Sequence, residues 1–267
     1  MGKHQEQEKM TMQRSISGRK SPFLEQLATI AQEAGRLIMQ ARAAGFAVEY
    51  KEDRSPVTHA DEAANHYIVG QLERLFPAIP TVSEEGAKLD AHGQRERFWL
   101  IDPLDGTKSF IRGEDDFTVN IGLIERRVPV AGVIYVPAQE VMYFGSDEAG
   151  AFRRGRDGQQ QPIRVNAPRD NKRAVIMSKH HASPDLEAYI APYEVTEKVQ
   201  ASSSLKFCYV AEGKADLYPR TGPTMEWDTA AGHAILLAAG GKMTMLDGSP
   251  FLYGKEGFLN PGFIAGV

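Results

Sequence analysis

The segment Trp99–Phe110, which reads W-L-I-D-P-L-D-G-T-K-S-F, constrains the fold of this chain more than any other. Its apolar beginning at 98–101 is followed by a proline and a glycine, which predicts a short buried strand that ends in a tight turn. The turn brings two carboxylates, Asp102 and Asp105, to one point, where they repel each other unless a cation lies between them. Oxygen donors of this kind suit Mg²⁺. The alternative is an ordinary surface turn, because Asp, Pro and Gly are common turn residues.

Three separated motifs resemble those of the Mg²⁺-dependent inositol monophosphatase superfamily. They are D-P-L-D-G-T at 102–107, S-E-E at 83–85 and E-W-D-T-A-A at 226–231. Within that superfamily, the segments 202–208 and 218–228 resemble most the CysQ-type 3′(2′),5′-bisphosphate nucleotidases. The resemblance implies a layered αβαβα sandwich of α+β or α/β class, of the Mg²⁺-dependent sugar-phosphatase type, made of two coupled halves.

The pattern along the chain supports this organisation. Residues 1–21 are polar and without periodicity, so we expect a disordered tail, with Met10 or Met12 as alternative starts. We expect an N-terminal α+β half at 22–167 that carries most metal ligands. A C-terminal α/β half at 168–267 would carry the substrate residues and the last metal ligand.

Composition narrows the class of protein. With 267 residues, 42% of them hydrophobic, the chain can bury a large core. A net charge of −4 gives no reason to expect nucleic-acid binding. The single cysteine, Cys208, excludes an internal disulfide and a cysteine-rich zinc site, which indicates the cytoplasm, with peripheral attachment at the inner membrane left open. No 18-residue apolar run is present, so we expect no transmembrane segment.

Periodicity and end signals predict the individual elements. Helices are expected at 24–45, 58–76, 107–111, 184–190, 205–212 and 228–239, and strands at 118–124, 128–136, 140–144, 174–177 and 215–218. The serines that precede residue 205 are expected to cap the helix that begins there.

The resemblance also implies a set of metal ligands and catalytic groups. The metal ligands would be Glu84, Asp102, Asp105, Asp228 and the carbonyl of Leu104. Thr107, with Asp61 behind it and Glu84 nearby, would orient and deprotonate the attacking water. The N–H groups of Gly106 and Thr107 would receive the phosphate, since the start of a helix favours an anion. Two alternatives remain open: Asp61 fits a capping box with Thr58, and Asp228 fits a helix N-cap.

The expected substrate is a small phosphorylated nucleotide, and the expected cofactor is Mg²⁺. By resemblance, Ser203, Lys206, Arg220 and Asp228 contact the substrate, and His181 lies near the base, although the neighbouring His180 leaves that register ambiguous. The implied reaction, sensitive to Li⁺, converts 3′-phosphoadenosine 5′-phosphate, a by-product of sulfate assimilation, to AMP and phosphate. An inositol or sugar phosphatase is the first alternative, and a non-catalytic regulatory protein on the same fold is the second.

Overall fold

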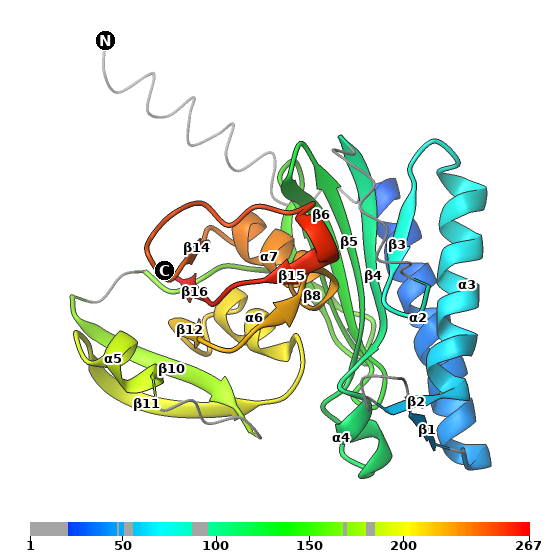
Figure 1. Cartoon of the computed structure of the whole chain (residues 1–267), viewed down its shortest axis with the longest axis horizontal. Helices are drawn as coiled ribbons and strands as arrows, with labels where there is room; N and C mark the ends of the chain where they lie inside the picture. The colour runs from blue at the N-terminus through cyan, green and yellow to red at the C-terminus, as the bar shows by residue number, and fades with distance from the viewer. Residues whose placement is uncertain (1–20, 47, 51–55, 87–95, 168–169, 180–184) are drawn as a thin grey trace.

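The computed structural model describes residues 21–46, 48–50, 56–86, 96–167, 170–179 and 185–267. Two long helices, α2 (Pro22–Ala44) and α3 (His59–Leu75), cover one face of a large sheet, and α6 (Leu205–Ala211) and α7 (Glu226–Ala238) cover the other (Figure 1). A second sheet lies beyond α6 and α7, and the short α5 (Leu186–Ile190) packs on its outer face. The order helix, sheet, helix, sheet, helix is the αβαβα sandwich that the sequence predicts.

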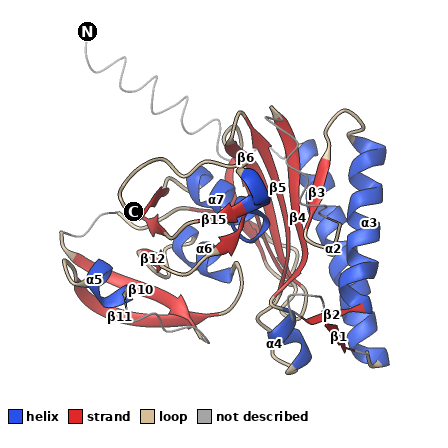
Figure 2. Ribbon diagram, in the orientation of Figure 1, coloured by secondary structure: helices blue, strands red, loops and turns tan. Residues whose placement is uncertain are grey.

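The large sheet has seven strands, which are hydrogen-bonded to one another in chain order within the described residues. Figure 2 shows β3 to β6 side by side. They are β3 (Thr81–Ser83), β4 (Arg97–Asp105), β5 (Thr118–Glu125), β6 (Val128–Val136), β7 (Val141–Ser146), β8 (Gly150–Arg154) and β9 (Gln160–Ile163). Strands β3 and β4 are parallel, and each later pair is antiparallel. A small ribbon of β1 (Val48–Tyr50) and β2 (Pro56–Thr58) precedes α3.

The second sheet has five strands in the order β11, β10, β12, β16, β14 over the described part of the chain. Their bounds are β10 (Lys172–Ser178), β11 (Glu194–Ala201), β12 (Leu217–Arg220), β14 (Lys242–Met245) and β16 (Phe263–Gly266). Strand β10 is parallel to both neighbours, whereas β16 is antiparallel to both of its own. The turn helix α4 (Thr107–Ile111), the pair β13 (Thr224–Met225) and β15 (Leu259–Asn260), and the 3₁₀ turn η1 (Glu256–Phe258) complete the described structure.

Strand β4 is apolar along its length because both of its faces are covered. Phe98 and Leu100 join the core beneath α6 and α7, whereas Trp99 and Ile101 join the core beneath α2 and α3. A strand buried on both faces reads as a continuous hydrophobic run rather than an alternating one. None of the helices among the described residues is both long and apolar enough to cross a membrane.

Helix α7 lies directly on the backbone of the large sheet. Gly122, Gly132 and Gly145 are register partners on β5, β6 and β7, and together they form a stripe without side chains, here called the glycine stripe. A Cβ atom at Gly132 would lie 2.4 Å from the carbonyl oxygen of Ala231 in α7. This close contact fixes the position of α7, whose first turn carries Asp228.

Several boundaries differ from the sequence-based expectations. Strand β4 continues through the turn to Asp105, α5 begins at Leu186, and α7 begins at Glu226. The serine cap expected for α6 is wrong, because the side chain of its N-cap residue, Ser204, makes no capping hydrogen bond. The Ser204 hydroxyl instead forms hydrogen bonds with Asp105 and Asn120 of the large sheet. The division into halves at residue 168 stays a prediction.

Candidate active site

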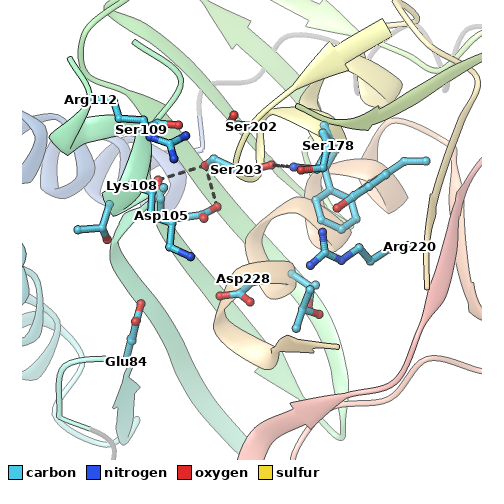
Figure 3. A pocket seen from close by; sticks show the side chains of 17 residues that line it. Glu84, Asp105, Lys108, Ser109, Arg112, Ser178, Ser202, Ser203, Arg220 and Asp228 are labelled. Carbon is cyan, nitrogen blue, oxygen red and sulfur yellow. Dashed lines mark hydrogen bonds between the residues drawn. The ribbon is translucent and has the colours of Figure 1, made fainter. Parts of the chain in front are cut away.

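A cavity of about 410 Å³ lies where the β4–α4 turn faces the beginnings of α6 and α7 (Figure 3). Acidic, hydroxyl and cationic side chains share its walls. Its lining includes Glu84, Asp105, Gly106, Thr107, Lys108, Ser109, Arg112, Ser178, Ser202, Ser203, Lys206, Phe207, Tyr218, Arg220, Thr224, Asp228 and Thr229. The structure therefore brings together in one cavity most of the site residues that the sequence predicts.

The β4–α4 turn delivers one acidic group and one hydroxyl to this cavity. Asp102, buried at the bend, accepts a hydrogen bond from the N–H of Leu104 at 3.1 Å, which closes the turn. Gly106 has a φ of 94°, in the left-handed region that favours glycine, and it allows the chain to reverse between Asp105 and Thr107. A Cβ atom at Gly106 would also crowd the carbonyl oxygen of Asp116 at 3.2 Å.

The carboxylates raise one another's affinity for positive charge. Burial raises the pKa of Asp102 well above its usual value, and the neighbouring charges of Glu84 and Asp105 raise it further. Burial, followed by the charge of Asp105, raises the pKa of Asp228 to about 8. A buried carboxylate with such neighbours either takes up a proton or binds a cation.

The donor set fits a hard divalent cation by its chemistry. The acidic side chains that meet here offer oxygen donors, and burial together with their mutual repulsion raises the pKa of Asp102 and of Asp228. Within the described ranges, no three acidic, histidine or cysteine side chains are close enough together to coordinate one metal ion in their present positions. The carbonyl of Leu104, expected as a fifth ligand, accepts a hydrogen bond from the Thr107 hydroxyl at 3.1 Å. The individual ligand assignments stay predictions.

Asp61 completes a capping box with Thr58 and also lies beside Thr107, while its catalytic role stays a prediction. Its Oδ2 accepts hydrogen bonds from the N–H of Thr58 at 2.8 Å and from the Thr58 hydroxyl at 2.6 Å, so it is a helix cap. Its Oδ1 lies 3.3 Å from the hydroxyl of Thr107, which reaches the cavity. Burial raises the pKa of Asp61 above its usual value, which favours a carboxylate that accepts a proton readily.

The residues expected to contact the substrate lie on the opposite wall. Lys206 is 4% exposed, and its Nζ donates a hydrogen bond to the carbonyl of Ser203 at 2.6 Å. Burial lowers its pKa to about 8. Arg220 donates from Nε to the carbonyl of Gly222 at 3.3 Å and lines the cavity beside Asp228 (Figure 3). His181 lies outside the described residues.

Sequence reasoning missed two cations on the α4 wall. Lys108 and Arg112 line the cavity from one face of the turn helix, across from Arg220 (Figure 3). Their spacing of four residues directly after the D-G-T motif was the available signal, because residues i and i+4 share a helix face. Asp228 is not the N-cap of α7, which is Met225, but it is the third residue of a capping box in which its Oδ2 accepts a hydrogen bond from the N–H of Met225 at 2.7 Å. Its role as a metal ligand stays a prediction.

Comparisons with known proteins agree with this architecture. The family model of the inositol monophosphatase family matches residues 19–263. The 3′(2′),5′-bisphosphate nucleotidase CysQ of Salmonella typhimurium is 44% identical over 245 residues, which cover 90% of this chain and 98% of the relative. The CysQ of Haemophilus influenzae is 34% identical and covers 91% of each chain.

Solved structures give the same placement. The crystal structure of CysQ from Bacteroides thetaiotaomicron has a TM-score of 0.77 and 38% identity, and it covers 89% of this chain and 94% of its own. The extragenic suppressor protein SuhB of Bartonella henselae has a TM-score of 0.75 and 26% identity, covering 92% of this chain and 94% of its own. With its three motifs on one cavity of an αβαβα sandwich, the chain belongs to the inositol monophosphatase family.

Proposed function

We propose that this protein is a 3′(2′),5′-bisphosphate nucleotidase, which hydrolyses the 3′-phosphate of 3′-phosphoadenosine 5′-phosphate to AMP and phosphate with Mg²⁺ as cofactor. The observation that carries the proposal is the distribution of charge in one cavity. Glu84, Asp105 and Asp228 lie together there, with cationic side chains on the walls around them. Metal ions held by the carboxylates would bind one phosphate, and the cationic side chains would bind a second anionic group. This arrangement matches a substrate with two phosphates.

The relatives favour the nucleotide over the other phosphate esters of the family. The curated relatives at 44% identity bear the name of a bisphosphate nucleotidase, whereas the SuhB structure is only 26% identical. In this chain Met225 and Glu226 stand before Trp227, where the inositol-phosphatase branch has a histidine and a cysteine. We also propose that the protein is cytoplasmic, as its single cysteine indicates.

The carboxylates of Glu84, Asp102, Asp105 and Asp228 and the Leu104 carbonyl would hold Mg²⁺, which supplies positive charge to the phosphoryl oxygens and to the leaving oxygen. The chain's own groups arrange the reactants. The N–H groups of Gly106 and Thr107 hold the scissile phosphate. The Thr107 hydroxyl orients the attacking water. Oδ1 of Asp61 lies 3.3 Å from this hydroxyl, so the Asp61 carboxylate can accept the proton that the water loses through Thr107.

No protein nucleophile takes part in this scheme. Cys208 is fully buried in the core beneath α7, and burial raises the pKa of its thiol well above the usual value. A buried thiol of this kind packs like a small apolar side chain. In the proposed reaction, water activated at the metal site is the acceptor of the phosphoryl group.

The test is phosphate release from a panel of bisphosphate nucleotides, inositol phosphates and sugar phosphates, each with Mg²⁺ and with EDTA. We expect 3′-phosphoadenosine 5′-phosphate to be the preferred substrate and EDTA to abolish activity. The Asp105→Asn variant keeps the shape of the side chain but removes its charge, so a loss of about 10²-fold or more is expected. Preference for an inositol phosphate would overturn the nucleotidase assignment, and full activity in EDTA would overturn the metal requirement.

A further inference from the structure

Asp105 is held by hydrogen bonds from residues about a hundred positions away. Its Oδ2 accepts from the N–H of Ser204 at 2.7 Å, from the Ser204 hydroxyl at 2.8 Å and from the Ser203 hydroxyl at 2.7 Å. A carboxylate oxygen has about two lone-pair positions, so three donors at this distance saturate it. Among the described residues, no side-chain or backbone donor reaches Oδ1 of Asp105, which is therefore the oxygen left for a cation.

Ser204 is itself held in place from the large sheet. The amide of Asn120 donates to the Ser204 hydroxyl at 2.8 Å and lies 3.3 Å from Oδ2 of Asp105. Asn120 and Ser204 are 1% and 2% exposed, so these bonds form away from water, where a broken one is costly. The geometry is a closed triangle of Asn120, Ser204 and Asp105.

Two further features connect this triangle to the rest of the site. The Ser204 hydroxyl lies 3.0 Å from the backbone carbonyl of Asp228, so one atom contacts two residues that are expected to bind the metal. Ser203, the preceding residue, has a φ of 59°, in the left-handed region that a serine rarely adopts. Such conformations persist where the surrounding structure requires them, often at functional sites.

We propose that Ser204, oriented by Asn120, is a positioning residue for the metal site: it directs Oδ1 of Asp105 into the cavity and sets the distance between Asp105 and the first turn of α7. This inference rests on the proposed function, because it concerns the same site. It explains why Ser204 does not cap α6: its oxygen accepts a hydrogen bond from the Asn120 amide, and its hydroxyl donates to the charged carboxylate of Asp105.

The test measures the binding of Mg²⁺ alone, by isothermal titration calorimetry, together with the rise in melting temperature that Mg²⁺ causes. We expect Ser204→Ala to weaken Mg²⁺ binding about 10-fold, since residues that orient metal ligands are typically worth 10- to 100-fold in affinity. The matched control is Ser146→Ala in β7, which removes another buried serine hydroxyl, one that accepts a hydrogen bond from the N–H of Ala149. The control should bind Mg²⁺ as the wild type does.

A double-mutant cycle separates positioning from general destabilisation. Asn120→Ala should weaken Mg²⁺ binding several-fold. Because Asn120 acts largely through Ser204, the double variant should lose little more than Ser204→Ala alone. Where Ser204→Ala does not fold, Asn120→Ala decides the question by the same measurement.

Wild-type affinity in the folded Ser204→Ala variant, an equal loss in Ser146→Ala, or full additivity in the cycle would each overturn the inference. A wild-type protein that binds no Mg²⁺ would overturn the proposed metal requirement, and the inference with it. A wild type that binds Mg²⁺ but cleaves no bisphosphate would overturn only the substrate assignment. The two failures are therefore distinguishable.

Discussion

In the proposed reaction, the hydroxyl of Thr107 orients the attacking water. It lies 3.1 Å from the carbonyl of Leu104 and 3.3 Å from Oδ1 of Asp61. The backbone N–H of the same residue begins α4 and is expected to contact the phosphate. Side chain and backbone of Thr107 thus have separable roles, and a substitution can remove one and leave the other.

Thr107→Ala should lower kcat by about 10²-fold with little change in KM. The variant keeps the N–H that binds phosphate and removes only the group that orders and relays the proton of the water, an interaction made mainly in the transition state. Steady-state kinetics on the bisphosphate nucleotide at saturating Mg²⁺ measure both constants. Thr107→Ser, which retains the hydroxyl, is the control. A large rise in KM at unchanged kcat would assign the hydroxyl to substrate binding instead.

Arg220→Ala should discriminate between two substrates. The guanidinium lines the cavity beside Asp228, where it can bind a phosphate remote from the one that is cleaved. Charge-assisted hydrogen bonds contribute about 1.5–3 kcal/mol each, so kcat/KM for the bisphosphate should fall roughly 10- to 150-fold. The simple phosphomonoester 2′-AMP should lose little. Equal losses on both substrates would mean that Arg220 supports the metal site in general.

At the scale of elements, the close contact between α7 and the glycine stripe positions the first turn of α7, which carries Asp228. The Cβ added by Gly132→Ala would meet backbone atoms of Ala231, so β6 or α7 must move. Overpacking of this kind costs about 1–3 kcal/mol, which should appear as a lower free energy of unfolding in urea.

Gly70→Ala is the matched control for this prediction. Gly70 lies in α3, and a Cβ atom there would have no neighbour within 4 Å. Alanine is a better helix former than glycine by roughly 1 kcal/mol, so this variant should be neutral or more stable. If both variants destabilise the protein alike, the loss at Gly132 does not come from contact with α7.

The sequence predicted elements whose signals are local. The long helices α2 and α3 have regular apolar spacing and identifiable caps, and both were predicted within a few residues. Strand β11, E-V-T-E-K-V-Q-A, was missed because it is an edge strand with charged residues that break the alternation.

The role of Ser204 could not be predicted from the neighbouring sequence, because its partner Asp105 is 99 positions away. The general preference for serine before a helix predicts a cap instead. The carboxylate pair of Asp102 and Asp105 was predicted from its spacing in one turn, whereas the other two acidic motifs were found through the family's pattern. The meeting of all three motifs in one cavity is a property of the folded chain, since two come from the large sheet's end of the site and one from α7.

At the scale of the whole molecule, His233 couples stability to pH. It is 4% exposed in α7, lies 3.1 Å from the hydroxyl of Tyr253, and burial lowers its pKa to about 3. Between the unfolded value near 6.5 and this folded value, the unfolded chain takes up a proton that the folded protein does not. The free energy of unfolding should therefore fall as the pH falls through this window, by up to about 1.4 kcal/mol per pH unit.

His233→Gln tests this coupling, because glutamine does not titrate. Urea unfolding at several pH values between 6 and 4 should give a shallower loss of stability in the variant than in the wild type. The comparison of slopes removes the contribution of the other titrating groups, which both proteins share. Identical slopes would show that His233 does not control acid stability.

The glycine stripe has a consequence for how the large sheet is assembled. A two-residue slip of β6 against its neighbours would place Ile134 under α7, where the backbone of Ala231 leaves no room for a side chain. Slipped pairings thus cannot accept the helix, and the stripe selects one alignment of β5, β6 and β7. Asn120 stands two residues from Gly122 on the same strand face, so that alignment also decides whether its amide reaches Ser204. The three glycines of the stripe therefore fix the strand alignment that brings Asn120 to Ser204, without the need for a bound ligand.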